Sequence, residues 1–108
     1  MRLTQRGDLL DIEYKNKALC RLCTNASVAA KKYGQEMAKK IQFRIDQIRA
    51  AESIEQMLQY RVGRCHQLRH NRSGQYAVDL VHPMRLVFEC NETEIQIACI
   101  IEITDYHR

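Results

Sequence analysis

The fold is decided by the segment YAVDLVHPMRLVFECNETEIQIACIIEIT, residues 76–104. Apolar residues alternate with other types along three stretches of it, which is the period of a strand with one face on a core. Between these stretches, residues 81–84 and 91–93 can turn the chain. The segment therefore predicts two successive hairpins, an antiparallel meander. On the last strand, the side expected to face the core carries Ile95, Ile97, Cys99, Ile101 and Ile103.

Upstream of this segment, the apolar residues follow a helical period instead. The clearest helix is predicted over residues 35–51, where the residues that recur at helical spacing are Met37, Ile41, Ile45 and Ile48. Ser27 is expected to cap a preceding helix over residues 28–33, which Gly34 ends.

Three further elements are expected in the same half of the chain. Ser53, followed by Gln56, predicts a capping box and a short helix through Gln59. Residues 17–25 form a short helix or a turn, and residues 9–14 form a first strand. Because helices must cover the apolar face of the meander, the predicted fold is α+β. Its small antiparallel sheet consists of the meander and the N-terminal strand, covered by the N-terminal helices.

Charge and composition restrict the class of partner. The formal net charge of +4 and the pI near 8.9 favour a polyanionic partner without deciding the fold. No apolar run reaches the roughly 18 residues that a membrane span needs, and the start of the chain is too polar for a signal peptide. We therefore expect a single cytoplasmic domain over residues 1–108, with no membrane partner.

The five cysteines are expected to be reduced thiols. Their number is odd, and the lone C-x-x-C pair of Cys20 and Cys23 has no second pair with which to complete a zinc site. In a helix, both residues would share an apolar face with Leu19 and act as small apolar side chains. No metal and no cofactor is expected.

A cationic segment lies between Glu55 and Asp79, where the sequence contains no carboxylate. Such a segment is typical of anion binding, most often of phosphate. Its basic residues are Arg61, Arg64, His66, Arg69, His70 and Arg72. Near its end the chain has an acid, a phenol and an imidazole that can move protons, namely Asp105, Tyr106 and His107. If folding brings these groups together with Arg85, they form a phosphate site with acid–base groups, as a ribonuclease requires.

Three pieces of sequence, in this order, resemble the HigB-type toxins of the RelE/ParE toxin–antitoxin superfamily. They are HQLRHNRSGQY at 66–76, MRLVF at 84–88 and EITDYH at 102–107. The order of elements is also similar from Leu9 onward. The chain departs from the usual pattern in having arginine for lysine at position 69, histidine for glycine at 70, methionine for tryptophan at 84, and Arg108 beyond the usual terminal histidine.

The resemblance implies a RelE-like fold and the toxin of a type II toxin–antitoxin system. Such toxins are messenger-RNA endonucleases that act in the decoding site of the ribosome, in contact with ribosomal RNA, and inhibit translation. Their chemistry is metal-free: the 2′-hydroxyl attacks the adjacent phosphorus and leaves a 2′,3′-cyclic phosphate. A cognate HigA-like antitoxin would neutralise the toxin, and operator DNA would be bound only through the antitoxin.

The resemblance also implies roles for residues. His66 matches an active-site histidine, and Arg69 and Arg85 match cations that we assign to the scissile phosphate, since an arginine can hold two phosphate oxygens at once. The terminal acid–aromatic–histidine set of these toxins matches Asp105, Tyr106 and His107. Which group is the acid and which is the base stays open. RNA contacts or simple solvated charges are expected of Arg61, Arg64 and Arg72.

Two other functions remain open. A ParE-type member would poison DNA gyrase without catalysis and would need neither His66 nor the terminal set, so their presence favours the nuclease. A plain RNA-binding module usually has aromatic stacking platforms, and this chain has no Trp, only Phe43, Phe88 and five tyrosines. Arg85 can alternatively pair across strands with Asp79 or Glu102. A solvated helix face, rather than a contact with ribosomal RNA, is expected of Lys31, Lys32, Lys39 and Lys40.

Strand alternation raises a question about the terminal set. Asp105 and His107 have the parity of Ile101 and Ile103, so strict alternation would bury two titratable groups. Either the curl of the sheet opens a cleft at that end, or a bulge reverses the facing. We expect the cleft.

Overall fold

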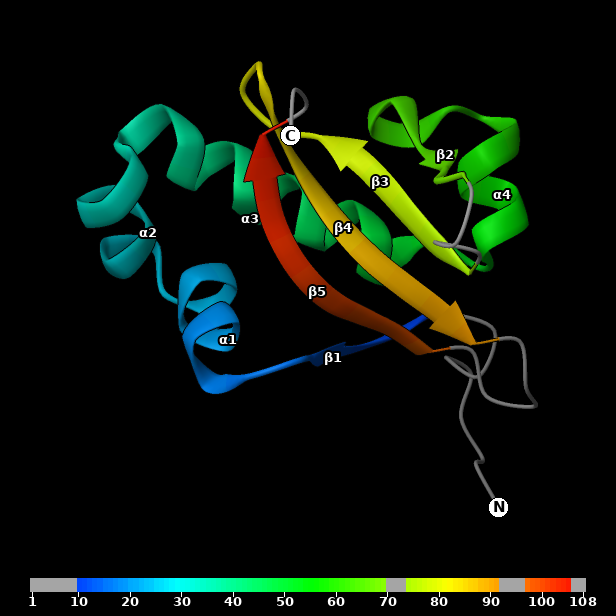
Figure 1. The fold of residues 1–108 in the computed structure, drawn as a ribbon, viewed down its shortest axis with the longest axis horizontal. Helices are drawn as coiled ribbons and strands as arrows, with labels where there is room; N and C mark the ends of the chain where they lie inside the picture. The colour runs from blue at the N-terminus through cyan, green and yellow to red at the C-terminus, as the bar shows by residue number, and fades with distance from the viewer. Residues whose placement is uncertain (1–9, 70–73, 92–96, 106–108) are drawn as a thin grey trace.

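The computed structural model describes residues 10–69, 74–91 and 97–105, and its α+β architecture confirms the predicted fold class (Figure 1). Along the chain, the elements are β1 Asp11–Tyr14, α1 Lys17–Thr24, α2 Ala26–Tyr33, α3 Gln35–Ala50, α4 Ile54–Gln59, the 3-10 turn η1 Val62–Arg64, β2 His66–Gln67, β3 Gln75–Asp79, β4 Met84–Asn91 and β5 Ile97–Asp105. In the described part of the chain, none of the helices has the length and apolar character to cross a membrane.

The five strands form one sheet in the order β1-β5-β4-β3-β2. Strands β2 to β5 pair as antiparallel neighbours, as the meander predicted. Strand β1 pairs with β5 in parallel, with Asp11 opposite Ile97 and Tyr14 opposite Ile100, so the sheet is mixed rather than wholly antiparallel. Alternation along residues 9–14 predicts a strand but not its direction, which is set by where the helices return the chain to the sheet.

Side-chain caps mark the starts of α1, α2 and α4, whereas α3 follows Gly34 without one. Asn25, and not Ser27, caps α2: its Oδ1 accepts hydrogen bonds from the backbone N–H of Ser27 at 3.0 Å and of Val28 at 3.3 Å. The predicted cap was wrong because Asn25 alone separates α1 from α2, so the capping position falls on it. The predicted cap of α4 is confirmed, since Ser53 Oγ accepts from the backbone N–H of Gln56 at 3.0 Å.

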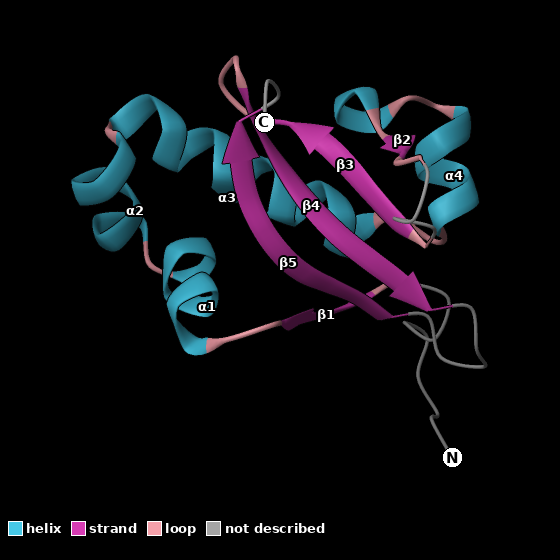
Figure 2. Ribbon diagram, in the orientation of Figure 1, coloured by secondary structure: helices cyan, strands magenta, loops and turns pink. Residues whose placement is uncertain are grey.

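The core lies between α3 and one face of the sheet, which we call the helix-covered face. Figure 2 shows α3 behind strands β3, β4 and β5. The predicted core residues of α3 are each at most 4% exposed: Met37, Ile41, Ile45 and Ile48. They share one cluster with sheet residues that are 0% exposed, among them Val78, Leu86, Phe88 and Ile100. The residues that the helical and strand periods predicted to be buried therefore pack together in this layer.

A bulge in β5 corrects the predicted facing of that strand. Val87 pairs with Glu102 but Phe88 pairs with Ile100, which leaves Ile101 as an extra residue. The bulge makes the prediction wrong for Ile97, Cys99 and Ile101: before it, the core side carries Ala98 and Ile100, both 0% exposed. Ile103, after it, packs on the core as predicted, and Ile95 lies outside the described residues.

The bulge leaves the facing of Asp105 as the alternation of residues 103 and 105 predicted. Because Ile101 precedes Asp105, the bulge does not turn Asp105 away from the side of Ile103. Asp105 pairs with Met84 and is half-buried at the end of the helix-covered face. The carboxyl group of Asp105 is therefore only half-buried, because Asp105 is the last residue of β5.

The opposite face of the sheet, which we call the open face, is turned toward the viewer in Figure 2. A small apolar cluster of Leu68, Ala77 and Val87, with Ile101 beside it, lies on this face. The register also places polar side chains there, namely His66, Asp79, Arg85, Glu102 and Thr104. The open face therefore carries a small apolar cluster and, beside it, titratable side chains.

Asn25→Ala is expected to lower the free energy of unfolding by about 1 kcal/mol, because it removes the acceptor of two backbone N–H groups. Ser27→Ala is the matched control and should change it by less than about 0.5 kcal/mol, the usual range for surface substitutions. Urea unfolding of the full chain measures both values. A larger loss from Ser27→Ala than from Asn25→Ala would contradict the observed cap.

Candidate functional site on the open face of the sheet

Arg85 occupies the centre of a polar row that crosses the open face. It lies directly opposite Asp79 on β3 and Thr104 on β5, and such facing residues have Cβ atoms about 5 Å apart. The pairing of Val87 with Glu102 puts Glu102 on the diagonal from Arg85. The Nε atom of Arg85 is shielded from solvent. Arg85 therefore has the acidic cross-strand neighbours that its strand position predicted, on a face that a ligand can approach.

Asp79 also binds Arg64, which reaches it from outside the sheet. The Nε of Arg64 lies 2.8 Å from the Oδ2 of Asp79, and the Arg64 side chain is 75% exposed. An ion pair this exposed contributes only about 0–1 kcal/mol. An anionic ligand can therefore take over Arg64 from Asp79 at small cost, beside Arg85.

The backbone of η1 directs Arg64 toward the sheet. Arg61, Gly63 and Arg64 have left-handed φ angles of 52°, 57° and 57°, a conformation that is uncommon outside glycine and that is found at functional sites. Gly63 is required for space as well, because a Cβ there would lie 2.8 Å from the Nε of Arg44. That same Nε donates a hydrogen bond to the Asp79 carbonyl at 2.6 Å. The turn is thus packed against α3 and the end of β3 together.

His66 lies in the next row of the open face, opposite Ala77. Its Nδ1 is 3.0 Å from the carbonyl oxygen of Arg64. Because a carbonyl oxygen only accepts hydrogen bonds, Nδ1 carries the proton in this contact, and the Nε2 of the neutral ring is then the basic nitrogen. Arg64 therefore orients the imidazole through its backbone and reaches the sheet through its side chain.

The structure brings together some of the residues that the sequence singled out. Arg64, His66 and Arg85 share the open face, where His66 on β2 and Arg85 on β4 lie in adjacent rows with β3 between them. Arg61 and Arg69 are exposed on the approach to β2 and just after it, and within the described part of the chain no contact ties them to this group. Asp105 lies on the helix-covered side, one residue beyond the partner of Arg85. The predicted residues Arg72, Tyr106 and His107 lie outside the described residues.

Asp79 belongs to this group, although the sequence suggested it only as a cross-strand partner of Arg85. It contacts Arg64 through its carboxylate and Arg44 through its carbonyl, and it faces Arg85 across the sheet. Its signal in the sequence is that it is the sole carboxylate between Glu55 and Glu89. A single carboxylate in a cationic segment can form ion pairs with the arginines around it and so fix their side chains.

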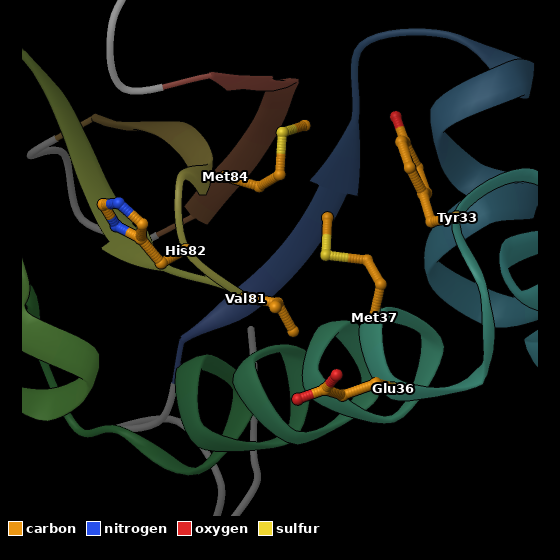
Figure 3. Close-up of a pocket in the computed structure, with 6 residues that line it drawn as sticks. All are labelled: Tyr33, Glu36, Met37, Val81, His82 and Met84. Carbon is orange, nitrogen blue, oxygen red and sulfur yellow. The ribbon is translucent and has the colours of Figure 1, made fainter.

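A hollow of about 170 Å³ lies on the helix-covered side, where the chain turns from β3 to β4. Figure 3 shows the side chains that line it: Tyr33, Glu36, Met37, Val81, His82 and Met84. None of these is a predicted site residue, although Met84 is the strand partner of Asp105. The hollow is therefore distinct from the group on the open face.

The thiols of the described chain are not arranged for catalysis or metal binding. Burial raises the pKa of Cys23 to about 12, with a smaller contribution from Cys20, and burial likewise raises the pKa of Cys65 to about 12. Within the described residues, no three His, Cys, Asp or Glu side chains are grouped so that they could hold a metal ion. Among the described residues, the open face carries the titratable side chains of His66, Asp79 and Glu102.

Comparisons with known proteins address the fold. The sequence matches no protein-family model and no curated protein. A solved structure described as a YoeB/ParE toxin from Agrobacterium tumefaciens superimposes with a TM-score of 0.58, over 89% of this chain and 98% of that chain. The chain has a YoeB/ParE-toxin fold. At 12% identity the likeness concerns the fold alone. It confirms the RelE-like architecture that the resemblance predicted, while the HigB subtype remains a prediction.

Cys23 and Cys65 are expected to resist iodoacetamide in the native protein at pH 8. A pKa near 12 leaves only about one thiolate in ten thousand at that pH, and both side chains are buried. Mass spectrometry of native and urea-unfolded samples measures the labelling of each cysteine, with the partly exposed Cys20 as the internal control. Equal labelling of Cys20 and Cys23 in the native protein would contradict the packing of α1.

Proposed function

We propose that this chain is the toxin of a toxin–antitoxin pair and a metal-independent endoribonuclease that cleaves messenger RNA in the ribosomal decoding site. The observation that carries the proposal is the position of an oriented histidine, His66, in the row next to Arg85 and Arg64 on one face of the sheet. The toxin fold supports the same class of function. A cytoplasmic location and the absence of a cofactor are parts of this proposal.

In the proposed reaction, Nε2 of His66 accepts the proton of the 2′-hydroxyl. The 2′-oxygen forms a bond to the adjacent phosphorus, and the bond from phosphorus to the 5′-oxygen breaks, which leaves a 2′,3′-cyclic phosphate. Arg85 and Arg64 bind the non-bridging oxygens, where negative charge increases in the transition state. Asp79 holds the guanidinium of Arg64 beside Arg85 until the RNA phosphate replaces its carboxylate.

The 5′-oxygen must receive a proton as it leaves. We assign this second proton carrier to Tyr106 or His107 of the terminal set, with the choice between them left open, and an orienting role to Asp105, whose side chain lies on the helix-covered side. Thr104 lies opposite Arg85, so the chain that continues into this set starts next to the proposed phosphate site. Contacts with the RNA backbone are proposed for Arg61, Arg69 and Arg72.

Two macromolecular partners follow from the proposal. Messenger RNA and ribosomal RNA are the polyanions that the net charge of +4 favours. A cognate HigA-like antitoxin is the protein partner that silences the toxin, and operator DNA is reached through that antitoxin.

Induction of the chain in bacteria, followed by mapping of new RNA 5′ ends, tests the proposal. Wild type should arrest growth and cut translated transcripts. His66→Ala and Arg85→Ala should each lower the frequency of cuts by about 10²–10⁴, the usual contribution of a general base or of electrostatic stabilisation. The matched controls His82→Ala, in the exposed β3–β4 turn, and Arg21→Ala, exposed on α1, should cut like wild type.

Other outcomes of this experiment are equally informative. Growth arrest with intact transcripts and DNA damage would replace the nuclease with gyrase poisoning. Unchanged cutting by His66→Ala and Arg85→Ala, in folded protein, would refute the site on the open face. Arg85→Lys should retain part of the activity, because lysine keeps the charge but loses the planar fork.

A further inference from the structure

The solvent side of α3 carries an exposed aromatic ring among cations. Phe43 is 52% exposed and is, with Tyr60, one of the large hydrophobic side chains exposed in the described part of the chain. Beside it is a hollow of about 300 Å³, lined by Glu36, Lys39, Lys40 and Phe43. These positions lie on the side of α3 away from its buried apolar residues, since they follow one another at helical spacing. Glu36, Lys39, Lys40 and Phe43, together with Arg44, are called the α3 platform.

The ring of Phe43 is supported from one side by a fixed cation. The guanidinium carbon of Arg44 lies 5.4 Å from the ring centroid, within the range of a cation–π contact. Arg44 is held in turn by two hydrogen bonds, from its Nε to the Asp79 carbonyl at 2.6 Å and from its Nη1 to Gln47 Oε1 at 2.8 Å. The exposed ring therefore rests on a side chain that is anchored to the sheet.

The charges around the ring favour an anion. Lys39, Lys40 and Arg44 are three cations against the carboxylates of Glu36 and Asp46, and Asp46 is paired with Arg49 at 3.6 Å. A flat exposed ring with long cationic side chains on both flanks is the arrangement by which proteins bind single-stranded nucleic acid. A peptide groove would instead present a row of apolar side chains at helical or strand spacing. The α3 platform has a single large apolar side chain, that of Phe43.

We propose that the α3 platform binds single-stranded RNA, with an unpaired base stacked on Phe43 and the flanking phosphates on Lys39 and Lys40. The ligand is taken to be RNA because the proposed function is a ribonuclease, and the inference rests on that function to this extent. A stacking platform and a cleavage site then occupy opposite sides of the sheet. Asp79 connects them, since Arg44 contacts its carbonyl and Arg64 its carboxylate.

The α3 platform gives a binding role to two features for which the sequence predicted none. The lysines at 39 and 40 were expected to form a solvated helix face, and the chain was expected to offer few aromatic platforms. Phe43 was counted among the few aromatic residues, but the helical period alone does not decide whether its ring lies at the edge of the core or in solvent. The contact with Arg44 is what turns an exposed ring into a supported one.

Phe43→Trp provides a direct test, because the chain has no Trp and the variant contains a single indole. The probe is a 2′-O-methyl oligouridylate of 12 nucleotides, which lacks the attacking hydroxyl and stays uncleaved. Stacking of a base on the indole should quench its fluorescence in a saturable manner. Saturable oligonucleotide binding by anisotropy without any quenching would overturn the proposal, because the RNA would then lie elsewhere.

Substitutions in the otherwise native full chain give a second measurement by anisotropy with the same labelled probe. Phe43→Leu should weaken binding about tenfold, while Phe43→Tyr should retain it. Lys39→Gln combined with Lys40→Gln should lower the slope of log K against log salt by about 1.4, since each phosphate contact on a single strand contributes about 0.7. The matched control, Lys17→Gln with Arg21→Gln, removes the same charge from exposed positions of α1 and should leave the slope unchanged.

The arms of the experiment separate the two proposals. Tight binding of the uncleavable probe that Phe43→Leu weakens supports the platform even if the wild-type chain cuts no transcript. Loss of affinity in both Phe43→Leu and Arg85→Ala assigns one strand to both surfaces, and loss in Phe43→Leu alone assigns the platform to a second strand such as ribosomal RNA. Equal affinity of Phe43→Leu and wild type, or binding of an acidic peptide in place of the oligonucleotide, overturns the platform while leaving the cleavage site untouched.

Discussion

The contacts of Asp79 hold together the two surfaces of this protein. Its carboxylate lies 2.8 Å from Arg64 and its carbonyl accepts a 2.6 Å hydrogen bond from Arg44, so η1, α3 and the end of β3 meet at one residue. Gly63 lets the turn approach Arg44 closely enough for this to happen. Without this junction, the guanidinium of Arg64 would lose its contact with the sheet, and Arg44, which lies over the ring of Phe43, would lose its hydrogen bond to β3.

The open face and the α3 platform use the same fold in different ways. On the open face, strand register brings Arg85, Asp79 and His66 into adjacent rows, so the spacing of charges is set by the sheet. On α3, helical spacing separates the buried face from Lys39, Lys40 and Phe43. A toxin-like fold at 12% identity to its structural relative is consistent with this division, because the core requires only apolar character and volume while the surface carries the chemistry.

Local patterns predicted much of the architecture. The period of Met37, Ile41, Ile45 and Ile48 placed α3 and its buried face, and alternation placed β3 and β4 with Arg85 away from the core. Predictions failed where one residue changes the outcome. Asn25 caps α2 two residues before Ser27, and the bulge at Ile101 moves Ile97 and Cys99 off the core side. Bulges and caps depend on how neighbouring elements meet, which periodicity does not encode.

The sequence by itself determined the α+β class, the meander and the cationic segment, because these depend on residue type and short-range spacing. His66 and Arg85 became candidates through the resemblance to a toxin family. Only the tertiary structure decided which arginine reaches the sheet, since Arg64 and Asp79 are brought together by the packing of η1 on α3 and β3. It also decided the parallel pairing of β1 with β5 and the hydrogen bond that anchors Arg44 to Asp79. These features join residues that are distant in the chain, and their energies come from contacts that exist only after the elements have packed.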